Sequence, residues 1–207
     1  MKNHCVDLLI LKKTPYGDTS LIVNCLSGKL GRVDLLIKGA RRLEKRKFPE
    51  IDIFNEINAY FSESKSGTVH TLSKSELTKS RIEIASFPKN LVIAMNCAKF
   101  ILSNTHFNMH SERLYRSTNV MLRDFCSGIA DDAWKLFIRL IYLEEQGFLP
   151  NYDTEKSSAS FAKMIRDILE YSDGGANKHP KLSEAYKGKL EKWIAGICQT
   201  HSLSDNF

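Results

Sequence analysis

The sequence predicts an α+β fold in which a small β-barrel is followed by a bundle of helices. Two observations support this prediction. Over residues 1–80, short apolar runs alternate with turn residues about every ten positions, which is typical of a small barrel or sandwich. From residue 81 the apolar residues recur at helical spacing, and no linker rich in Pro, Gly or Ser separates the two regimes. We therefore expect two domains, residues 1–80 and 81–207, with the strands grouped before the helices.

Five strands are expected in the first domain, at residues 4–13, 19–26, 31–38, 51–61 and 68–77. The third run shows the pattern most clearly, because Val33, Leu35 and Ile37 share one face and a period of two indicates a half-buried strand. Turn residues separate the runs, and Pro15 and Gly17 predict a turn between the first two strands. This series of short strands makes a five-stranded OB-fold β-barrel the candidate architecture.

Five helices are expected in the second domain, at about residues 87–104, 112–126, 131–146, 159–172 and 180–202. The third of them is apolar over more than half of its circumference, which favours a central, buried helix. Gly147 is a suitable C-terminal cap for that helix, and Pro150 prevents the helix from resuming. Trp134 and Trp193 fall on apolar helix faces, and we expect both in the core.

The positive charge of the chain is concentrated in one short stretch. The net charge is +6, and residues 1–80 contain 14 Lys and Arg against 9 Asp and Glu. Residues 38–47 hold six cations and a single acid, so the rest of that region is neutral. The cations are Lys38, Arg41, Arg42, Lys45, Arg46 and Lys47. A strand that ends in such a loop suggests an anionic polymer as partner, although charge alone favours a solvated surface loop.

Two further residues complete the candidate nucleic-acid-binding site. Arg32 opens the third strand and adds one more cation to that part of the chain. Tyr60 falls on the polar face of the expected fourth strand, from which it can stack on a base. A lone exposed Tyr is nevertheless more often an ordinary surface residue, so this alternative stays open.

Other features of the sequence point to a cytoplasmic protein. The five cysteines are widely scattered and form no Cys-x-x-Cys pair, which fits a reducing compartment and buried thiols. The first residues show no secretory signal. The longest apolar stretches are far shorter than the roughly 18 residues that cross a bilayer. We therefore expect no membrane partner.

Patterns for catalysis or metal binding are weak. Gly28 and Lys29 lack the flanking residues of a phosphate-binding loop. His106 and His110 are four residues apart, as in some zinc sites, but their segment has the character of a loop and carries no Glu between them. The acidic pairs at 131–132 and 144–145 lie too far apart along one helix to converge. We expect no enzymatic activity, no cofactor and no metal.

Three segments of the chain form a specific combination, namely residues 16–20 (YGDTS), residues 31–32 (GR) and residues 38–42 (KGARR). Together they resemble the RecO family of bacterial DNA repair proteins, with a weaker match at residues 147–150 (GFLP). In the family the first of these usually reads Tyr-Gly-Glu, so Asp18 is a conservative departure. The order of the expected elements also agrees with the family over essentially the whole chain.

The resemblance implies an N-terminal OB barrel, a C-terminal helical domain, and binding of single- and double-stranded DNA. It also implies strand annealing, and work with RecR to place RecA on strands coated by single-strand-binding protein, in association with the nucleoid. Many family members carry two zinc-binding Cys-x-x-Cys pairs just after the segment that matches residues 147–150. Residues 151–160 contain no cysteine here, so we predict a helical domain without zinc.

Three other functions remain open at the level of the sequence. An OB barrel with a basic loop also suits structured RNA, and competition between RNA and DNA of equal length separates these two. A metal-dependent nuclease would have its site in the helical half. A pure protein-docking adaptor needs only the helical domain and leaves the basic loop without a role.

Overall fold

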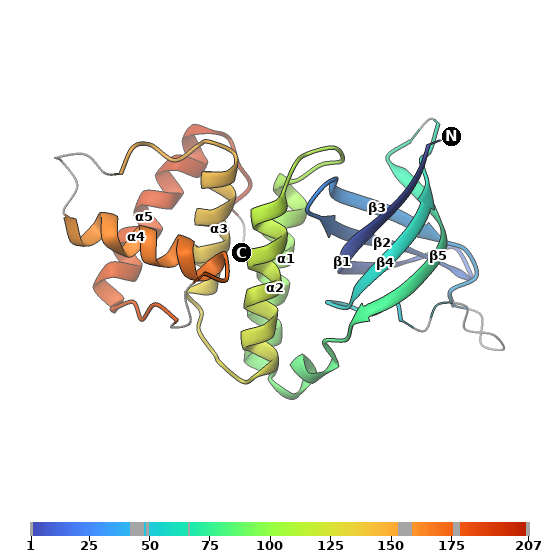
Figure 1. Ribbon diagram of the computed structural model, residues 1–207, viewed down its shortest axis with the longest axis horizontal. Helices are drawn as coiled ribbons and strands as arrows, with labels where there is room; N and C mark the ends of the chain where they lie inside the picture. Colours follow the sequence, from blue (N-terminus) through green and yellow to red (C-terminus); the bar gives the residue numbers. More distant parts are fainter. Residues whose placement is uncertain are drawn as a thin grey trace. The chain divides into compact units, whose positions relative to one another are not determined.

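The computed structural model describes residues 2–41, 48, 50–65, 67–152, 159–175 and 179–205. Its contacts divide the chain into two compact units. The barrel unit comprises Met1–Glu83 together with Thr105–Tyr115, and the helical unit comprises Ile84–Asn104 with Arg116–Phe207. Figure 1 labels the strands and helices of both units.

The barrel is built from five strands. They are β1 (Asn3–Tyr16), β2 (Ser20–Ser27), β3 (Gly31–Ile37), β4 (Glu56–Ser62) and β5 (Val69–Lys79). They close in the order β1-β2-β3-β5-β4, and every neighbouring pair is antiparallel except β3 and β5. This closed five-stranded barrel with helices after it confirms the predicted α+β class, and its strand order is that of an OB fold.

The fourth strand is shorter than the sequence pattern predicts. The predicted strand at 51–61 begins only at Glu56, because Phe54 has a φ of 68°, which an extended strand does not allow. The Phe54 side chain is buried all the same, and its backbone N–H donates to the carbonyl oxygen of Ile10 at 2.7 Å. The apolar residues before β4 therefore belong to a loop that packs on the barrel.

The alternation of β3 places its two faces as the sequence predicts. Val33, Leu35 and Ile37 have no exposed surface and point into the barrel, while the side chains between them point outward. The core that they join is completed by residues from the other strands and from the loop before β4. It includes Leu8, Ile10, Val23, Cys25, Ile51, Ile57, Ala59, Phe61 and Leu72.

The segment Thr105–Tyr115 joins the barrel through backbone hydrogen bonds to the β2–β3 turn and the start of β3. The N–H of Arg32 donates to the carbonyl oxygen of His106 at 3.2 Å, and the N–H of Asn108 donates to that of Leu30 at 2.8 Å. The Phe107 ring packs against the barrel core, with its centroid 4.5 Å from that of the His70 ring. Residues that are distant in sequence from the strands thus pack at the end of the barrel where the β2–β3 turn lies.

Gly31 is required for this arrangement on two grounds. Its φ is 67°, in the left-handed region that side chains other than hydrogen disfavour. A Cβ at this position would also meet the carbonyl oxygens of Met109 and His106, the latter at 2.5 Å. The Gly-Arg pair that opens β3 therefore marks where the Thr105–Tyr115 segment approaches the strand.

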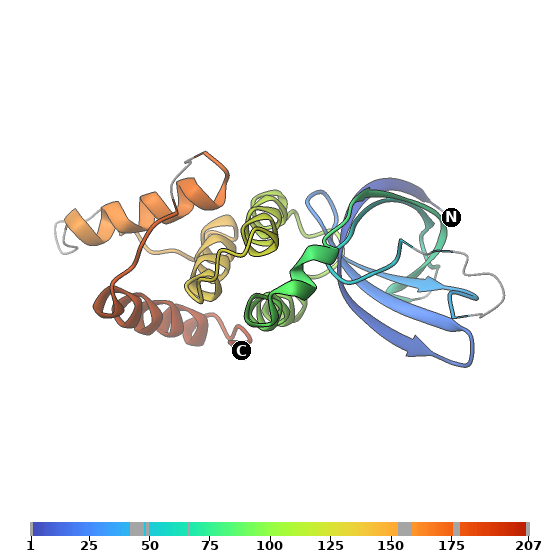
Figure 2. The same ribbon diagram turned by 90° about the horizontal axis from the view of Figure 1, so that it is seen from below.

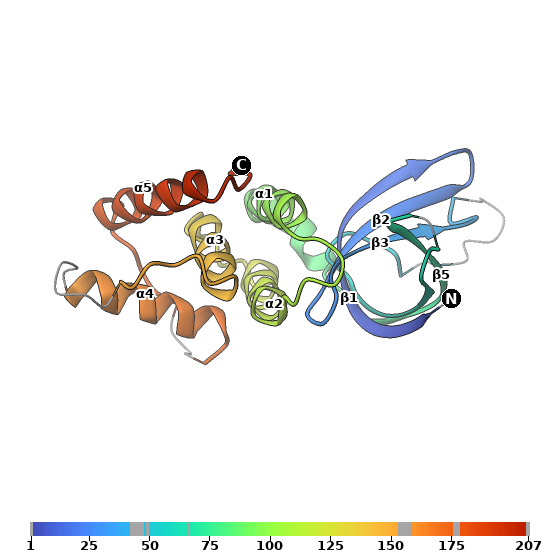
Figure 3. The same cartoon turned by 90° about the horizontal axis from the view of Figure 1, so that it is seen from above.

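The described residues after the barrel strands form the five helices that the sequence predicts. After the 3₁₀ turn η1 (Ile82–Ser86) they are α1 (Pro88–Asn104), α2 (Glu112–Cys126), α3 (Trp134–Glu145), α4 (Ala159–Ser172) and α5 (Glu184–Thr200). The first turn of α2 belongs to the barrel unit, and the rest of α2 belongs to the helical unit. Helix α3 contacts α1, α4 and α5, and its residues 136–143 are all buried, as expected of a central helix. Figure 2 and Figure 3 show α3 enclosed among the other helices of this unit.

Two expectations about buried side chains need correction. Trp134 is fully buried, but Trp193 is only half-buried, because its ring lies beside Phe161 at the edge of a groove next to residues 147–150. The cysteines likewise divide, since Cys5 is exposed on the outside of β1. Burial raises the pKa of the Cys97 thiol to about 12, so that thiol stays protonated.

Candidate nucleic-acid interface

The turn between β1 and β2 and the start of the basic loop meet at one end of the barrel. The backbone N–H of Arg41 donates to the carbonyl oxygen of Thr19 at 2.9 Å. The guanidinium of the same residue, through Nη1, donates to the carbonyl oxygen of Gly17 at 3.2 Å. Gly17 has a φ of 56°, which the tight turn requires. Residues 16–20 and the start of residues 38–42 therefore lie side by side, although they are well separated in sequence.

The cations at this end point away from the core. Gly39 and Ala40 are buried, and Gly39 turns the chain with a φ of 73°. The side chains of Lys38 and Arg41, on either side of them, are exposed. The predicted site residues Arg42, Lys45, Arg46 and Lys47 lie outside the described residues. The described part of the predicted loop is thus a buried backbone turn that carries two exposed cations.

Arg32 is already engaged with a carboxylate. Its Nε and Nη2 donate to the two carboxylate oxygens of Asp34, at 2.9 and 2.8 Å. Asn24 on the neighbouring strand donates to the same carboxylate at 2.8 Å. The Asp34 side chain is only 14% exposed, whereas that of Arg32 is 33% exposed. The two charges compensate each other, so Arg32 presents less net charge than Lys38 or Arg41.

Tyr60 is not brought together with the basic loop. On β4 it is paired with Cys5, near the start of β1, whereas Arg41 packs on the turn that follows the other end of that strand. Lys74 on β5 lies over its ring, with Nζ 5.5 Å from the centroid. Hydrogen bonding to Cys5 raises the pKa of the Tyr60 hydroxyl. The neighbours of Tyr60 are therefore Cys5 and Lys74, on the part of the barrel wall near the start of β1.

The structure adds two residues of β1 that were not among the predicted site residues, and one of them, Tyr16, precedes the Gly17 to which Arg41 is hydrogen-bonded. Tyr16 and Lys12 are both exposed on β1, and their even spacing after the irregularity at Ile10 places them on one face. The alternation of residues 12, 14 and 16, read together with the turn that follows, is the signal that points to them.

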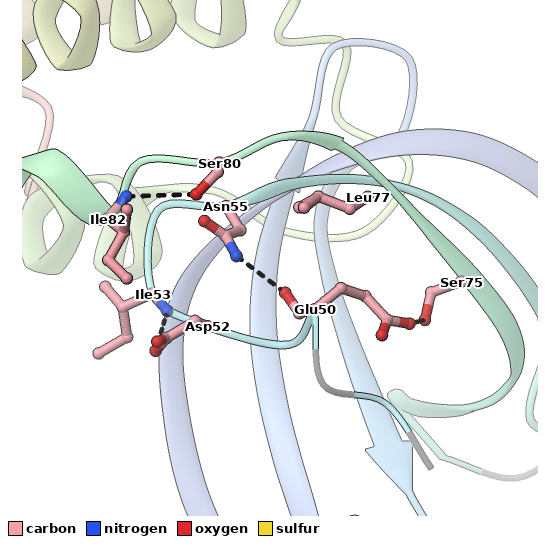
Figure 4. Close-up of a pocket in the computed structure, with 8 residues that line it drawn as sticks. All are labelled: Glu50, Asp52, Ile53, Asn55, Ser75, Leu77, Ser80 and Ile82. Atoms are coloured by element: carbon pink, nitrogen blue, oxygen red, sulfur yellow. Dashed lines mark hydrogen bonds between the residues drawn. The ribbon is translucent and has the colours of Figure 1, made fainter. Parts of the chain in front are cut away.

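A cavity of about 630 Å³ opens on the barrel unit between the loop before β4 and the end of β5 (Figure 4). Its walls combine apolar side chains with two carboxylates, Glu50 and Asp52. The Glu50 carboxylate accepts a hydrogen bond from the Ser75 hydroxyl, and Asp52 forms an ion pair with Lys13. Carboxylates at its mouth disfavour phosphate, so this cavity does not belong to the candidate interface.

The acidic pairs at the ends of α3 do not assemble into a metal site. Asp131 and Asp132 instead form ion pairs with Lys187 of the α5 helix, which lowers the pKa of the Asp132 carboxyl. Over the described ranges, no group of three or more His, Cys, Asp and Glu side chains is arranged to hold a metal ion. Nor does any described helix combine the length and apolar character needed to span a bilayer.

The fold and this end of the barrel together define a class of protein, the OB-fold proteins with exposed cations beside the β1–β2 turn and after β3. Comparison with known proteins supports this class. Residues 1–81 match the family model described as recombination protein O, N terminal. This part of the chain is therefore similar to the N-terminal domain of the RecO family.

Similarity to individual relatives extends beyond the barrel. The chain is 23% identical over 153 residues to the DNA repair protein RecO of Bacillus cereus, an alignment that covers 72% of this chain and 59% of the relative. It is 26% identical over 145 residues to the DNA repair protein RecO of Maridesulfovibrio salexigens, with 70% and 59% covered. The chain therefore spans about three-fifths of the length of the relatives it matches.

Proposed function

We propose that this chain is a DNA-binding recombination mediator in DNA repair. It binds single- and double-stranded DNA without strong sequence preference, and it anneals complementary strands. With RecR it helps to place RecA on strands coated by single-strand-binding protein. The observation that carries the proposal is the meeting of Arg41 with the β1–β2 turn in a barrel that matches the family model.

The proposed chemistry is non-covalent. Each Lys or Arg that neutralises a phosphate releases condensed counterions, so the logarithm of the affinity falls linearly with the logarithm of the salt concentration. Lys38 and Arg41 are the exposed cations of the described interface, and Arg42, Lys45, Arg46 and Lys47 extend it. Arg32 contributes less, because Asp34 compensates its charge. No described helix presents these cations to a groove of the duplex, so contacts to phosphate prevail over contacts to base edges.

Annealing follows from the same charge neutralisation. Two complementary strands repel each other through their phosphates, and a protein surface that carries several cations lowers this repulsion when both strands bind near it. We propose RecR, RecA and single-strand-binding protein as partners because the chain is similar to proteins named DNA repair protein RecO. No catalytic residue and no cofactor is part of the proposed mechanism.

The salt dependence of DNA binding tests the proposal. Binding of a labelled single strand and of a duplex of equal length is measured over a salt series for the wild-type chain and for Lys38→Ala, Arg41→Ala and Arg42→Ala. We expect each substitution to reduce the slope of log K against log salt by about 0.7 for the single strand and about 0.9 for the duplex. Arg32→Ala should reduce it by less than Arg41→Ala does.

Lys163→Ala is the matched control, because this exposed Lys of α4 removes one positive charge far from residues 38–42 in sequence and outside the barrel unit. It should leave both slopes unchanged. Equal slopes for the wild type and all three loop variants would show that the loop is a solvated surface without a DNA-binding role. Stronger competition by RNA than by DNA of the same length would favour an RNA-binding protein instead.

The role with partner proteins needs a separate measurement. Annealing of complementary strands coated with single-strand-binding protein is followed in the presence of this chain, with and without RecR. We expect this chain to accelerate annealing of the coated strands, and Arg41→Ala to weaken that effect. Failure to anneal coated strands, together with normal binding to bare DNA, would limit the function to DNA binding alone.

A further inference from the structure

We propose that Tyr16 stacks on a base of bound single-stranded DNA and makes the β1–β2 turn the part of the interface that distinguishes single strands from duplex. This inference rests on the proposed DNA-binding function and assigns a specific role within it. It also replaces Tyr60 as the aromatic residue of the interface.

The side chain of Tyr16 is available to a ligand. Tyr16 is the last residue of β1, and its exposed fraction is 56%, compared with 39% for Tyr60 and 36% for Tyr186. Across the described chain, no aromatic ring or cation packs against Tyr16, whereas Lys74 lies over the ring of Tyr60. A base that stacks on Tyr16 therefore displaces no aromatic ring or cation of the described residues.

The backbone under Tyr16 is held in a regular ladder. Beyond the barrel core, β1 and β2 continue as a paired ribbon in which Thr14 faces Ile22 and Tyr16 faces Ser20. Figure 2 and Figure 3 show this ribbon running on from the barrel wall. Pro15 further restricts the chain, since its ring fixes φ. Because this backbone is held in place before binding, only the rotation of the Tyr16 side chain has to be restricted when a base stacks on its ring.

Arg41 lies next to the turn that carries this ring, and a second cation lies further back on the same strand. The guanidinium of Arg41 is hydrogen-bonded to the carbonyl oxygen of Gly17, the residue that follows Tyr16, and the backbone of Arg41 is hydrogen-bonded to Thr19. Lys12 lies two alternations back on the same face of β1. A strand whose phosphates bind Arg41 therefore has its bases near Tyr16. The combination of an exposed aromatic ring with neighbouring cations is how single-strand-binding surfaces are built.

Duplex DNA offers Tyr16 nothing comparable. Its bases are paired and stacked on one another, so their faces are covered, while its phosphates remain accessible to Arg41 and Lys38. Removal of the Tyr16 ring should therefore weaken binding of single strands selectively. Alanine substitution of a stacking aromatic typically lowers affinity by about 5- to 150-fold.

The test compares oligothymidylate with a duplex of equal length, both labelled, using the full chain. Tyr16→Ala should lower the affinity for the single strand by about 5- to 150-fold and leave its salt slope unchanged, because no charge is lost. Its affinity for the duplex should stay at the wild-type value. Tyr16→Phe and Tyr16→Trp should retain single-strand binding, since both keep an aromatic face. Tyr186→Ala is the matched control, because this exposed Tyr of α5 lies outside the barrel unit, and it should leave both affinities unchanged.

Several results would overturn the inference. A loss with Tyr16→Ala that is equal for single strand and duplex would mean that the substitution disturbs the turn and not a stacking contact. The same conclusion follows if Tyr16→Phe loses as much affinity as Tyr16→Ala. If the wild type binds DNA with the expected salt slope while Tyr16→Ala behaves like it, the stacking role falls and the proposed function stands. If the wild type binds neither DNA, both fall together.

Discussion

Alanine substitutions at two glycines of the barrel unit form a matched pair. The difference between them measures how strongly the Thr105–Tyr115 segment is bound to the barrel strands. Gly17 and Gly31 both have positive φ, at 56° and 67°, so alanine is strained to a similar degree at either position. Their surroundings differ. A Cβ at Gly17 meets nothing within 4 Å, whereas one at Gly31 runs into the carbonyl oxygens of His106 and Met109. The difference between Gly31→Ala and Gly17→Ala therefore isolates the contact with the segment.

The size of the effect follows from these contacts. Alanine in the left-handed region costs about 1–2 kcal/mol, which is the whole expected loss for Gly17→Ala. At Gly31 the neighbouring backbone must also move away, and this weakens the hydrogen bonds Arg32 N–H to His106 and Asn108 N–H to Leu30. Two such bonds contribute about 1–3 kcal/mol in total. We therefore expect Gly31→Ala to destabilise the barrel unit by about 2–5 kcal/mol.

The assay must report on the barrel and not on the helices. Both tryptophans, Trp134 and Trp193, lie in the helical unit, so intrinsic tryptophan fluorescence follows the unfolding of that unit. Amide hydrogen exchange is the suitable measurement, because the N–H groups of Arg32 and Asn108 are two of the donors that join the segment to the barrel. Their protection should fall sharply in Gly31→Ala and only slightly in Gly17→Ala.

Equal loss of protection in the two variants would refute this reasoning, since it would show that backbone strain alone sets the cost. Unchanged protection of the Asn108 amide in Gly31→Ala would be equally decisive. It would mean that the Thr105–Tyr115 segment accommodates a methyl group without moving.

Two other side chains of the barrel unit allow sharp predictions. Asp34→Asn removes the charge that compensates Arg32, so at about 0.1 M salt the affinity should rise about fivefold for a single strand and about eightfold for a duplex, each with a steeper salt slope. An unchanged slope would contradict the compensation. Burial lowers the pKa of the His70 imidazole below its ordinary value of 6.5. As the pH falls through this region, the unfolded state therefore binds more protons than the folded state does. The barrel should lose stability as the pH falls from about 7 to 5, and urea unfolding of His70→Phe should show a weaker pH dependence over that range; identical pH dependence would refute it.

The regular part of the fold is readable from the sequence because each element satisfies one periodicity. The alternation of Val33, Leu35 and Ile37 predicts the strand and its buried face, and all three are fully buried. The limit of this reasoning appears at residues 51–55. Ile51 and Phe54 are as apolar as strand residues, but burial in a loop produces the same apolar pattern as burial in a strand, and the backbone reversal at Phe54 has no signal in composition.

The candidate site is only partly predictable, because charge and pairing are different properties. The sequence shows that Arg32 is a cation, but the ion pair with Asp34 depends on side chains two residues apart sharing the outer face of β3. Alternation also places Tyr60 outward correctly, yet it does not show that Lys74 lies over the ring. The register of β1 with β2 and β4 decides which Tyr is near the cations, and register depends on long-range pairing.

The length of strand β3 separates the residues that hold the Thr105–Tyr115 segment from those proposed to bind DNA. Gly31 at its start receives the Thr105–Tyr115 segment, and Lys38 follows its other end, beside the β1–β2 turn. Seven residues at about 3.3 Å each place these two ends about 20 Å apart, with fully buried side chains between them. Contacts at that separation are energetically independent in most proteins. Substitutions at the end proposed to bind DNA can therefore change its charge and its aromatic residue without weakening the contacts of the segment at the other end.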